Sequence, residues 1–272
     1  MTDTFDLVLR KINRLSSSTL DFRFESVDGH EFRYQPGQFY RFLFELDGHE
    51  IERSYSICTY GDEVGASPFL DLVISYVDDG RASQYLFAAE EGIRCRVSGP
   101  YGRLLIPSIL PNRLVMVATS VGIAPFMPML WELTDDPRYA ELRIELVFGI
   151  RSPEEFLYRD ILVALAQRDN IAIRICYSQE LPKQPKANDY DGRVQIALAA
   201  LDLKPETDHV LLCGNPFMID EVYADLKLRG FRVRSVVREK YVFARETKTA
   251  AKPVMSDEDR RLIEEKLKKF RK

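Results

Sequence analysis

Short apolar segments separated by turn signals fill the first hundred residues of the chain. Val, Ile, Phe and Tyr dominate the segments, while Gly, Pro and Asp mark the turns, as in VDGHE, QPGQ and LDGHE. Strands this short and this frequent are typical of an antiparallel barrel or sandwich. The expected strands are TFDLVLRKINRL, DFRFESV, GQFYRFLFEL, RSYSICT, FLDLVISYV and IRCRVSG. One helix is expected among them, in RASQYLFAAEEG, which ends at Gly92.

The pattern changes near residues 107–111. After them, apolar strands alternate with helical stretches: RLVMVAT, LRIELVFGI, IAIRICYS and HVLLCG are each followed by a helix, and the strand VRSVVREK comes last. This βαβ repetition predicts a parallel sheet with helices on both faces, which binds ligands at the carboxyl ends of its strands. We therefore expect a β-barrel or sandwich domain over 1–108 and an α/β domain over 112–243.

The remaining segment, 244–272, is polar and then helical in pattern. Ser256 and Asp259 resemble a capping box, and Ile263, Leu267 and Phe270 form one apolar stripe. Its many Lys and Arg residues could attract an acidic partner, but we favour a helix docked on its own domain.

Composition excludes several classes of protein. The chain has 272 residues and a net charge of −4, which gives no reason to expect nucleic-acid binding. No apolar run approaches the ~20 residues that span a membrane, and the N-terminus lacks the features of a signal peptide. The four cysteines lie far apart and predict no metal centre; a reduced, cytoplasmic compartment fits them. The cysteines are Cys58, Cys95, Cys176 and Cys213.

The first candidate motif is RSYS, residues 53–56, on an expected strand. Arg53 could pair with phosphate oxygens, Tyr55 could lie flat against an aromatic ring, and Ser56 could hydrogen-bond a ring nitrogen. Taken alone, the motif favours an exposed strand with an ordinary mixture of residues, because four residues match easily by chance.

The second motif is DDGRASQYL, in which a turn at Gly80 leads into a helix that carries Ser83 in its first turn. Backbone N–H groups at a helix N-terminus suit a phosphate or pyrophosphate. The alternative is that Ser83 merely caps a surface helix.

Two further motifs place small-residue turns after strands of the expected parallel sheet. In VMVATSVGIAPFMPML, the helix opens at Ala124 and Pro125; in LLCGNPFMIDEV, Cys213 stands at the carboxyl end of its strand. Small residues let a ligand approach the backbone closely. Cys213 could equally be a small buried apolar residue.

Together and in this order, R-x-Y-S, G-x-x-S, G-P-x-G (99–102), T-x-x-G-I-A-P and C-G-N-P resemble the ferredoxin–NADP reductase family, up to about Tyr241. The resemblance implies a β-barrel that binds FAD: Arg53 would take the pyrophosphate, Tyr55 would pack along the flavin, and Ser56 would lie near flavin N5. An aromatic residue would lie near the flavin's other face, with Tyr241 the first candidate and Phe243 the second.

The resemblance also implies two sets of cofactor contacts. For FAD they are Arg53, Ser54, Tyr55, Ser56, Gly80, Ala82, Ser83 and Tyr241. For NADP(H) they are Thr119, Gly122, Ile123, Ala124, Arg151, Ser178, Arg193, Cys213, Gly214, Asn215 and Met218. Ser56, Cys213 and Tyr241 are the expected catalytic residues.

The chain departs from the family pattern in its nucleotide-binding region. Ser120 stands where the family usually has Gly, and Val121 where it often has Thr. Gln179 follows Ser178 where an arginine often binds the 2′-phosphate of NADP. Arg151 and Arg193 match other positions that can contact this phosphate, so NADPH is preferred over NADH. Otherwise Arg151 is a solvated loop charge and Arg193 a helix-start residue.

The implied function is electron transfer between NADPH and a separate one-electron carrier, ferredoxin or flavodoxin. The alternatives are an NADH-dependent reductase of an iron–sulfur oxygenase and a free-flavin reductase. A non-catalytic redox sensor on the same fold is disfavoured by the intact R-x-Y-S and C-G-N-P motifs.

Overall fold

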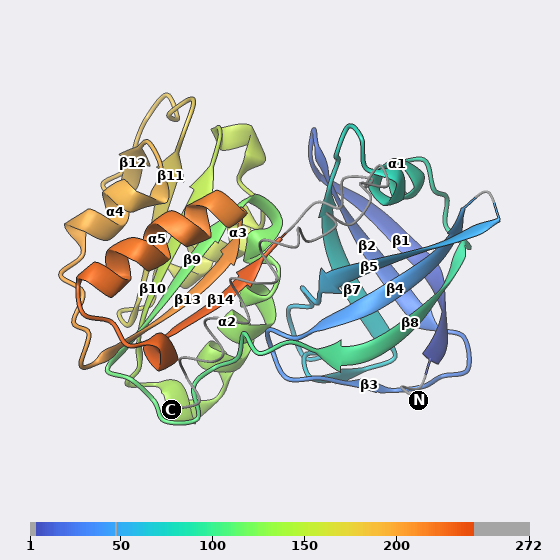
Figure 1. The fold of residues 1–272 in the computed structure, drawn as a ribbon, viewed down its shortest axis with the longest axis horizontal. Helices are drawn as coiled ribbons and strands as arrows, with labels where there is room; N and C mark the ends of the chain where they lie inside the picture. Colours follow the sequence, from blue (N-terminus) through green and yellow to red (C-terminus); the bar gives the residue numbers. More distant parts are fainter. Residues whose placement is uncertain (1–3, 47, 242–272) are drawn as a thin grey trace, which may run out of the picture. The chain divides into compact units, whose positions relative to one another are not determined.

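The computed structural model describes residues 4–46 and 48–241. Their N-terminal part forms a six-stranded antiparallel sheet in the order β5-β4-β8-β1-β2-β7 (Figure 1). Its strands are β1 (Thr4–Ser16), β2 (Thr19–Ser26), β4 (Phe39–Leu46), β5 (His49–Ser56), β7 (Phe69–Ser75) and β8 (Arg94–Tyr101). Two short strands, β3 (Phe32–Arg33) and β6 (Ala66–Ser67), pair separately.

Alternation along the strands builds the barrel. On β2, Leu20, Phe22 and Phe24 are buried in the barrel core, whereas Asp21 and Arg23 face the other side. The edge strands β5 and β7 contact each other, and the amide of Cys58, just after β5, donates to the carbonyl of Asp71 on β7 (3.0 Å). Closure therefore brings the end of the R-x-Y-S strand beside the strand that leads into helix α1 (Arg81–Phe87).

Helix α1 is shorter than the sequence predicts: it ends at Phe87 and not at Gly92. Glu90 and Glu91 follow, and carboxylates are unfavourable at the negative end of a helix dipole. Gly92 instead closes a turn with φ +98° and donates its amide to Leu9 on β1 (2.8 Å).

The C-terminal part is a six-stranded parallel sheet in the order β12-β11-β10-β9-β13-β14. The strands are β9 (Arg113–Thr119), β10 (Arg143–Ile150), β11 (Ile171–Tyr177), β12 (Asp189–Asp191), β13 (Asp208–Gly214) and β14 (Val236–Lys240). The strand order reverses at β9, between β10 and β13, and such a switch point is where open α/β sheets bind ligands.

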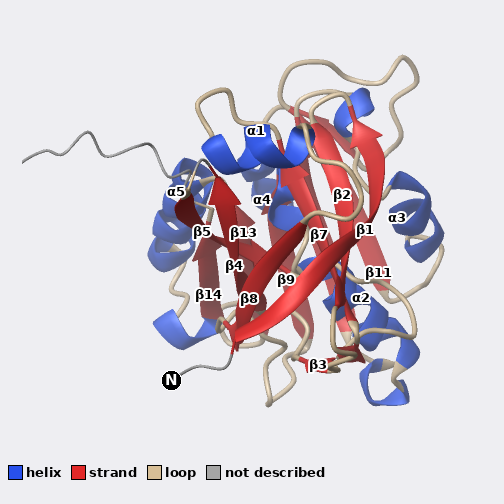
Figure 2. Ribbon diagram, turned by 90° about the vertical axis from the view of Figure 1, so that its right-hand side faces the viewer, coloured by secondary structure: helices blue, strands red, loops and turns tan. Residues whose placement is uncertain are grey.

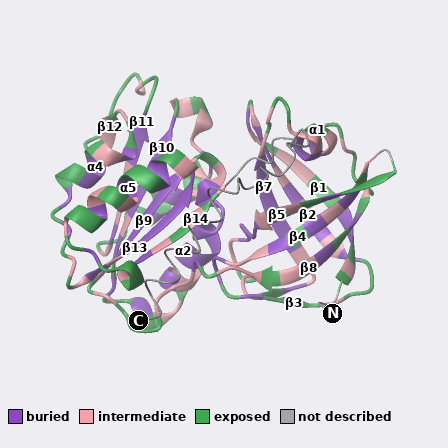
Figure 3. Cartoon of the chain, viewed as in Figure 1, coloured by how far each residue is buried: buried purple, intermediate pink, exposed green. Residues whose placement is uncertain are grey.

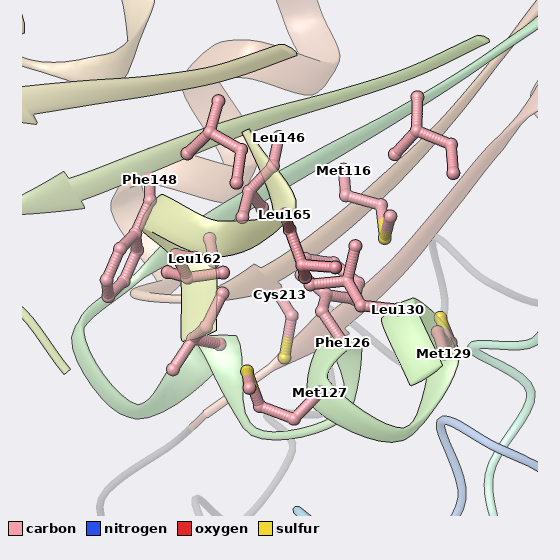
Figure 4. Packing of buried hydrophobic residues seen from close by; sticks show 14 of the residues in the cluster. Met116, Phe126, Met127, Met129, Leu130, Leu146, Phe148, Leu162, Leu165 and Cys213 are labelled. Carbon is pink, nitrogen blue, oxygen red and sulfur yellow. The ribbon is translucent and has the colours of Figure 1, made fainter. Parts of the chain in front are cut away.

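Helices cover both faces of this sheet, as βαβ repetition predicts (Figures 1 and 2). The helices are α2 (Phe126–Asp135), α3 (Arg159–Leu165), α4 (Val194–Ala200) and α5 (Pro216–Leu228), and the 3₁₀ turns are η1 (Ser120–Ile123), η2 (Pro137–Tyr139), η3 (Pro153–Glu155) and η4 (Val233–Ser235). Side chains of α2 and α3 form one apolar cluster with the sheet (Figure 4). Side chains of α4 and α5 form another cluster with the sheet.

The central strands β9 and β13 of the parallel sheet are almost entirely buried, as is most of β7 in the antiparallel sheet (Figure 3). Strand β8 ends at Tyr101 and β9 begins at Arg113, and the domain limits 108 and 112 stay predictions within that interval. The extension 244–272 and Phe243 lie outside the described residues. Within residues 4–46 and 48–241, no helix is long and apolar enough to cross a membrane.

Candidate active site

Ser56 and Tyr241, two of the predicted catalytic residues, are in direct contact. The Tyr241 hydroxyl donates to Ser56 Oγ (2.6 Å), and Ser56 Oγ donates to Oε1 of Glu239 (2.9 Å). Ser56 ends β5 in the barrel, whereas Glu239 is on β14 and Tyr241 follows it. The fold thus assembles a phenol, a hydroxyl and a carboxyl group into one hydrogen-bonded chain.

Glu239 is the site residue that sequence reasoning missed. The periodicity of a strand could have indicated it. Alternate residues of an extended chain lie on the same face, so residue 239 shares a face with residue 241. Burial raises the pKa of Glu239 to about 7 from its ordinary 4.5, and the hydrogen bond from Ser56 opposes this rise. The carboxyl group therefore changes its charge near neutral pH.

This pKa predicts a pH dependence of stability. An acid whose pKa is raised by folding binds more protons in the folded state, so the free energy of unfolding falls as pH rises from about 4.5 to about 7. Glu239→Gln is expected to reduce the stability difference between pH 5 and pH 8 in urea denaturation. The exposed control Glu206→Gln should keep the full difference; equal curves for both variants would contradict the assignment.

Cys213 lies within the apolar cluster at the end of β13 and is fully buried (Figure 4). Burial raises the pKa of its thiol well above the ordinary value, so the sulfur is uncharged. Tyr241 packs against the same cluster, and its amide donates to Gly214 O (2.9 Å). Cys213 is thus both a core residue, as the alternative interpretation held, and a neighbour of Tyr241. Its catalytic role stays a prediction.

The two nucleotide-binding turns interlock through glycines and one hydroxyl. Thr119 Oγ1 accepts the amide of Asn215 (3.0 Å). A Cβ on Gly122 would lie 2.5 Å from Cys213 O, and one on Gly214 would lie 2.5 Å from Thr119 Oγ1. These glycines therefore let the turn after β9 meet the turn after β13 at the switch point, where a nucleotide would bind.

Several residues that are predicted to contact the nucleotide have side chains that are buried or already hydrogen-bonded within the protein. Ile123, Ala124 and Met218 are buried at 0%, 2% and 7% exposure. The Asn215 side chain accepts the amides of Phe217 (2.9 Å) and Met218 (3.3 Å), which makes it the N-cap of α5. If these residues touch a cofactor, they do so mainly through their backbone.

Ser120, the departure from the family glycine, has φ +50° at the start of η1. This left-handed conformation suits glycine and costs roughly 1–2 kcal/mol for other residues. The turn therefore keeps the geometry for which glycine is suited, despite the substitution.

The barrel residues predicted to bind FAD fit an anionic nucleotide. Arg53 is partly exposed, and its guanidinium bonds only the neighbouring carbonyl of Glu52 (2.7 Å) among the described residues. The Tyr55 ring stands edge-on to Phe42 at 5.8 Å and rests on the barrel core. Ser54, on the opposite face of β5, is exposed. A charge and an aromatic ring are thus held side by side on a rigid strand.

The start of α1 offers backbone donors. The first helical bond runs from Gln84 N to Gly80 O (2.9 Å), so the amides of Ala82 and Ser83 precede it. A Cβ at Gly80 would lie 2.7 Å from Ser83 Oγ, which explains the glycine. The Ser83 hydroxyl itself accepts from Val77 N (3.1 Å) and lies 2.9 Å from Gly80 O. It shapes the turn, and only its amide is left for a phosphate.

The residues predicted to contact the 2′-phosphate of NADP differ in whether their side chains are already bonded within the protein. Arg151 forms a two-point ion pair with Glu155, with Nε 2.9 Å from Oε2. Ser178 Oγ donates to the carbonyl of Ile150 (3.2 Å). Arg193 is exposed at the start of α4 and has no ion pair within the described residues. Arg193 is therefore the more available cation of the two arginines.

Comparison with known proteins identifies the two domains and the family. A model of the oxidoreductase FAD-binding domain matches residues 6–106, and one of the oxidoreductase NAD-binding domain matches residues 116–223. The chain is 32% identical over 227 residues to ferredoxin–NADP reductase B of Sorangium cellulosum, covering 81% of this chain and 90% of that protein. NADH-cytochrome b5 reductase 1 of Candida glabrata is 26% identical over 236 residues, with coverages of 84% and 79%.

A solved structure of similar fold is a ferredoxin NADP⁺ reductase from Neisseria gonorrhoeae with bound FAD and NADP. Its TM-score is 0.72 at 20% identity, and the match covers 88% of this chain and 99% of that one. The sequence matches and the shared two-domain fold lead to one conclusion. The chain belongs to the ferredoxin–NADP reductase family and is an NAD(P)H-dependent flavoprotein oxidoreductase with FAD and NADP(H) as its cofactors.

Proposed function

We propose that the chain transfers electrons between NADPH and a separate ferredoxin or flavodoxin in the cytoplasm. The observation that carries this proposal is the hydrogen-bonded chain Tyr241–Ser56–Glu239 beside Cys213, which joins the flavin-binding barrel to the nucleotide-binding sheet. The relative from Sorangium cellulosum, named a ferredoxin–NADP reductase, supports the choice of carrier. The four cysteines are free thiols, as a reducing compartment requires.

FAD, when bound, supplies the chemistry that links two-electron hydride transfer to one-electron steps. The protein's part is binding, orientation and exclusion of water. Arg53 and the amides at the start of α1 would hold the pyrophosphate. Ser56 is held by Glu239, whose carboxyl group can keep a proton at this hydroxyl near pH 7. The Tyr241 side chain packs over the cluster that contains Cys213 and keeps this part of the site dry.

An NADH-dependent reductase is the second candidate function, and a specific observation favours it. Arg151 is already neutralised by Glu155, and Gln179 replaces an expected arginine. A 2′-phosphate would then have to displace Glu155 from Arg151 or rely on Arg193. Relatives named NADH-cytochrome b5 reductase are compatible with this reading.

The nucleotide preference is tested with three variants. Arg193→Ala is expected to weaken NADP binding by about tenfold and to leave NAD binding unchanged, because a charge-assisted contact is lost. Arg151→Ala should have a smaller effect, since Glu155 already occupies this guanidinium. Gln179→Arg should strengthen NADP binding. Dissociation constants for NADP and NAD, measured at one salt concentration, check all three.

If both alanine variants bind NADP as the parent protein does, neither Arg151 nor Arg193 holds the 2′-phosphate, and an NADH-dependent reductase becomes the better interpretation. Stopped-flow reduction of the flavin by NADPH and by NADH measures the same preference during turnover. Electron transfer from the reduced enzyme to purified ferredoxin, flavodoxin, cytochrome b5 and free FMN then identifies the acceptor. A chain that binds FAD but is reduced by neither nucleotide would be a non-catalytic sensor.

A further inference from the structure

The turn between helix α5 and strand β14 projects two large apolar side chains into solvent. Leu228, the last residue of α5, is 88% exposed, and Val233, the first residue of η4, is 73% exposed. Between them lies Gly230 with φ +92°, the left-handed conformation that ends a helix. Single exposed apolar residues are ordinary, but two on one tight turn indicate a contact surface. At these exposures the side chains project from the surface and do not line a groove.

The linker between the two domains adds a third exposed apolar side chain, because Ile109 is 87% exposed. The amide of Asn112, at the end of this linker, donates to the carbonyl of Thr207 in the loop before β13 (2.9 Å). Pro205 of the same loop lies beside the turn, since a Cβ on Gly230 would be 3.8 Å from its Cγ. The three segments therefore adjoin one another at the amino ends of β9, β13 and β14. We call residues 109–112, 204–207 and 227–234 the amino-end surface.

Three unpaired cations accompany the apolar side chains of the turn. Lys227, Arg232 and Arg234 are exposed, and none of them has an ion pair within residues 4–46 and 48–241. Arg229, which lies between them in sequence, is instead paired with Asp225 (2.8 Å). The chain as a whole has a net charge of −4, so this turn is positive against the overall charge of the protein.

The neighbouring loop offsets only part of this charge. Lys204 is paired with Asp202 (2.7 Å). Glu206 is exposed and has no ion pair in the described part of the chain. On the amino-end surface, as far as the structure describes it, three unpaired cations thus face one unpaired carboxylate.

We propose that the amino-end surface docks on a membrane that contains anionic lipids. The ammonium group of Lys227 and the guanidinium groups of Arg232 and Arg234 would pair with lipid phosphates. The side chains of Leu228 and Val233 would enter the boundary between headgroups and acyl chains. Charge and apolar surface on one projecting turn match the two components of such an interface.

Two other occupants fit the surface less well. A symmetric contact with a second copy of the chain would place the same three cations opposite their counterparts, which repels. A protein partner typically takes up exposed aromatic side chains. The one aromatic residue of the turn, Phe231, is only 6% exposed and packs in the core beneath α5. The groups left for contact are aliphatic or cationic, as a lipid surface requires.

The amino-end surface lies at the opposite end of the parallel sheet from the candidate active site. Gly214 and Tyr241 mark the carboxyl ends of β13 and β14, whereas Gly230 and η4 precede the amino end of β14. Docking would therefore leave the nucleotide-binding turns facing away from the membrane. Variants of this surface should keep the parent's rate of flavin reduction, which separates this proposal from that of the electron carrier.

Sedimentation with lipid vesicles tests the proposal on the full, FAD-loaded chain. Vesicles of phosphatidylcholine alone are compared with vesicles that also contain phosphatidylglycerol. We expect an apparent affinity at least about tenfold higher for the anionic vesicles, since each cation near such a surface contributes about fivefold. Added salt should weaken this binding, because interactions between exposed charges are screened.

Variants of exposed residues separate the two contributions with little risk to folding. Arg232→Gln combined with Arg234→Gln should weaken binding to anionic vesicles by about tenfold or more. Leu228→Gln should weaken it by up to about tenfold, through loss of apolar contact. The matched control is Arg94→Gln combined with Lys11→Gln, which removes two exposed charges from the barrel and should leave binding unchanged.

Four results would overturn the proposal. The first is equal binding to both kinds of vesicle, or to neither. The second is unchanged binding in the double arginine variant, which would place the contact elsewhere, as in the cation-rich segment 257–272. The third is binding of polyglutamate, but not of anionic vesicles, that the double variant loses; this would indicate an acidic protein partner. The fourth is a dimer in sedimentation velocity that Leu228→Gln dissociates, which would indicate a second copy.

Discussion

Replacing Gly214 with alanine is expected to lower the free energy of unfolding by about 2–5 kcal/mol. Two effects combine at this position. The added Cβ would lie 2.5 Å from Thr119 Oγ1 and 2.8 Å from Thr119 O, and neither turn can retreat without breaking the hydrogen bond from Asn215 to Thr119. In addition, φ at Gly214 is +121°, where alanine is strained.

Urea denaturation measures this loss, and Gly29→Ala separates its two causes. Gly29 also has a positive φ, +77°, but a Cβ there would have no neighbour within 4 Å. Its alanine variant should therefore lose only about 1–2 kcal/mol, the cost of the backbone conformation. Equal losses at the two positions would show that the turns after β9 and β13 are not packed as tightly as the structure shows.

Replacing Arg53 with alanine is expected to weaken FAD binding by about ten- to a hundredfold, because a charge-assisted contact to the pyrophosphate would be lost. The guanidinium has one hydrogen bond among the described residues, to the backbone of Glu52, so the change should cost little stability. Titration of the apoprotein with FAD, followed by flavin fluorescence, measures the affinity.

Ser54→Ala is the comparison variant. Ser54 is also an expected FAD contact, but it is uncharged and exposed on the opposite face of the strand, so its loss should weaken FAD binding less than the loss of Arg53. Equal FAD retention in both variants would count against the role of Arg53. Chromatography of the cofactor released from the parent protein is the companion measurement, with FAD expected; FMN, or no flavin, would contradict the assignment of the whole barrel site.

The three residues predicted to be catalytic, Ser56, Cys213 and Tyr241, are ones that the structure brings together, and the sequence could indicate them because they belong to short, ordered motifs or follow them in the family pattern. R-x-Y-S indicated Ser56 on a strand, C-G-N-P indicated Cys213 at the end of another, and the family resemblance indicated Tyr241 as the aromatic residue near the flavin. What the motifs could not supply was Glu239, which makes its contact across 183 residues of sequence. The pairing of Arg151 with Glu155, a partly buried residue of η3, was likewise missed, because no motif indicates which carboxylate a loop arginine will bind.

The sequence by itself determined the two-domain pattern of this protein, short strands followed by βαβ repeats, since side-chain periodicity follows local backbone geometry. The sequence was a poorer guide to where an element ends: helix α1 ends at Phe87 and not at Gly92. Only the tertiary structure decided which side chains remain available to a ligand. Ser56 is bound by Glu239 and Tyr241, and Cys213 is buried, because the fold brings together groups from distant parts of the chain. The side chains of Ser83 and Asn215 are instead occupied by the amides of nearby residues.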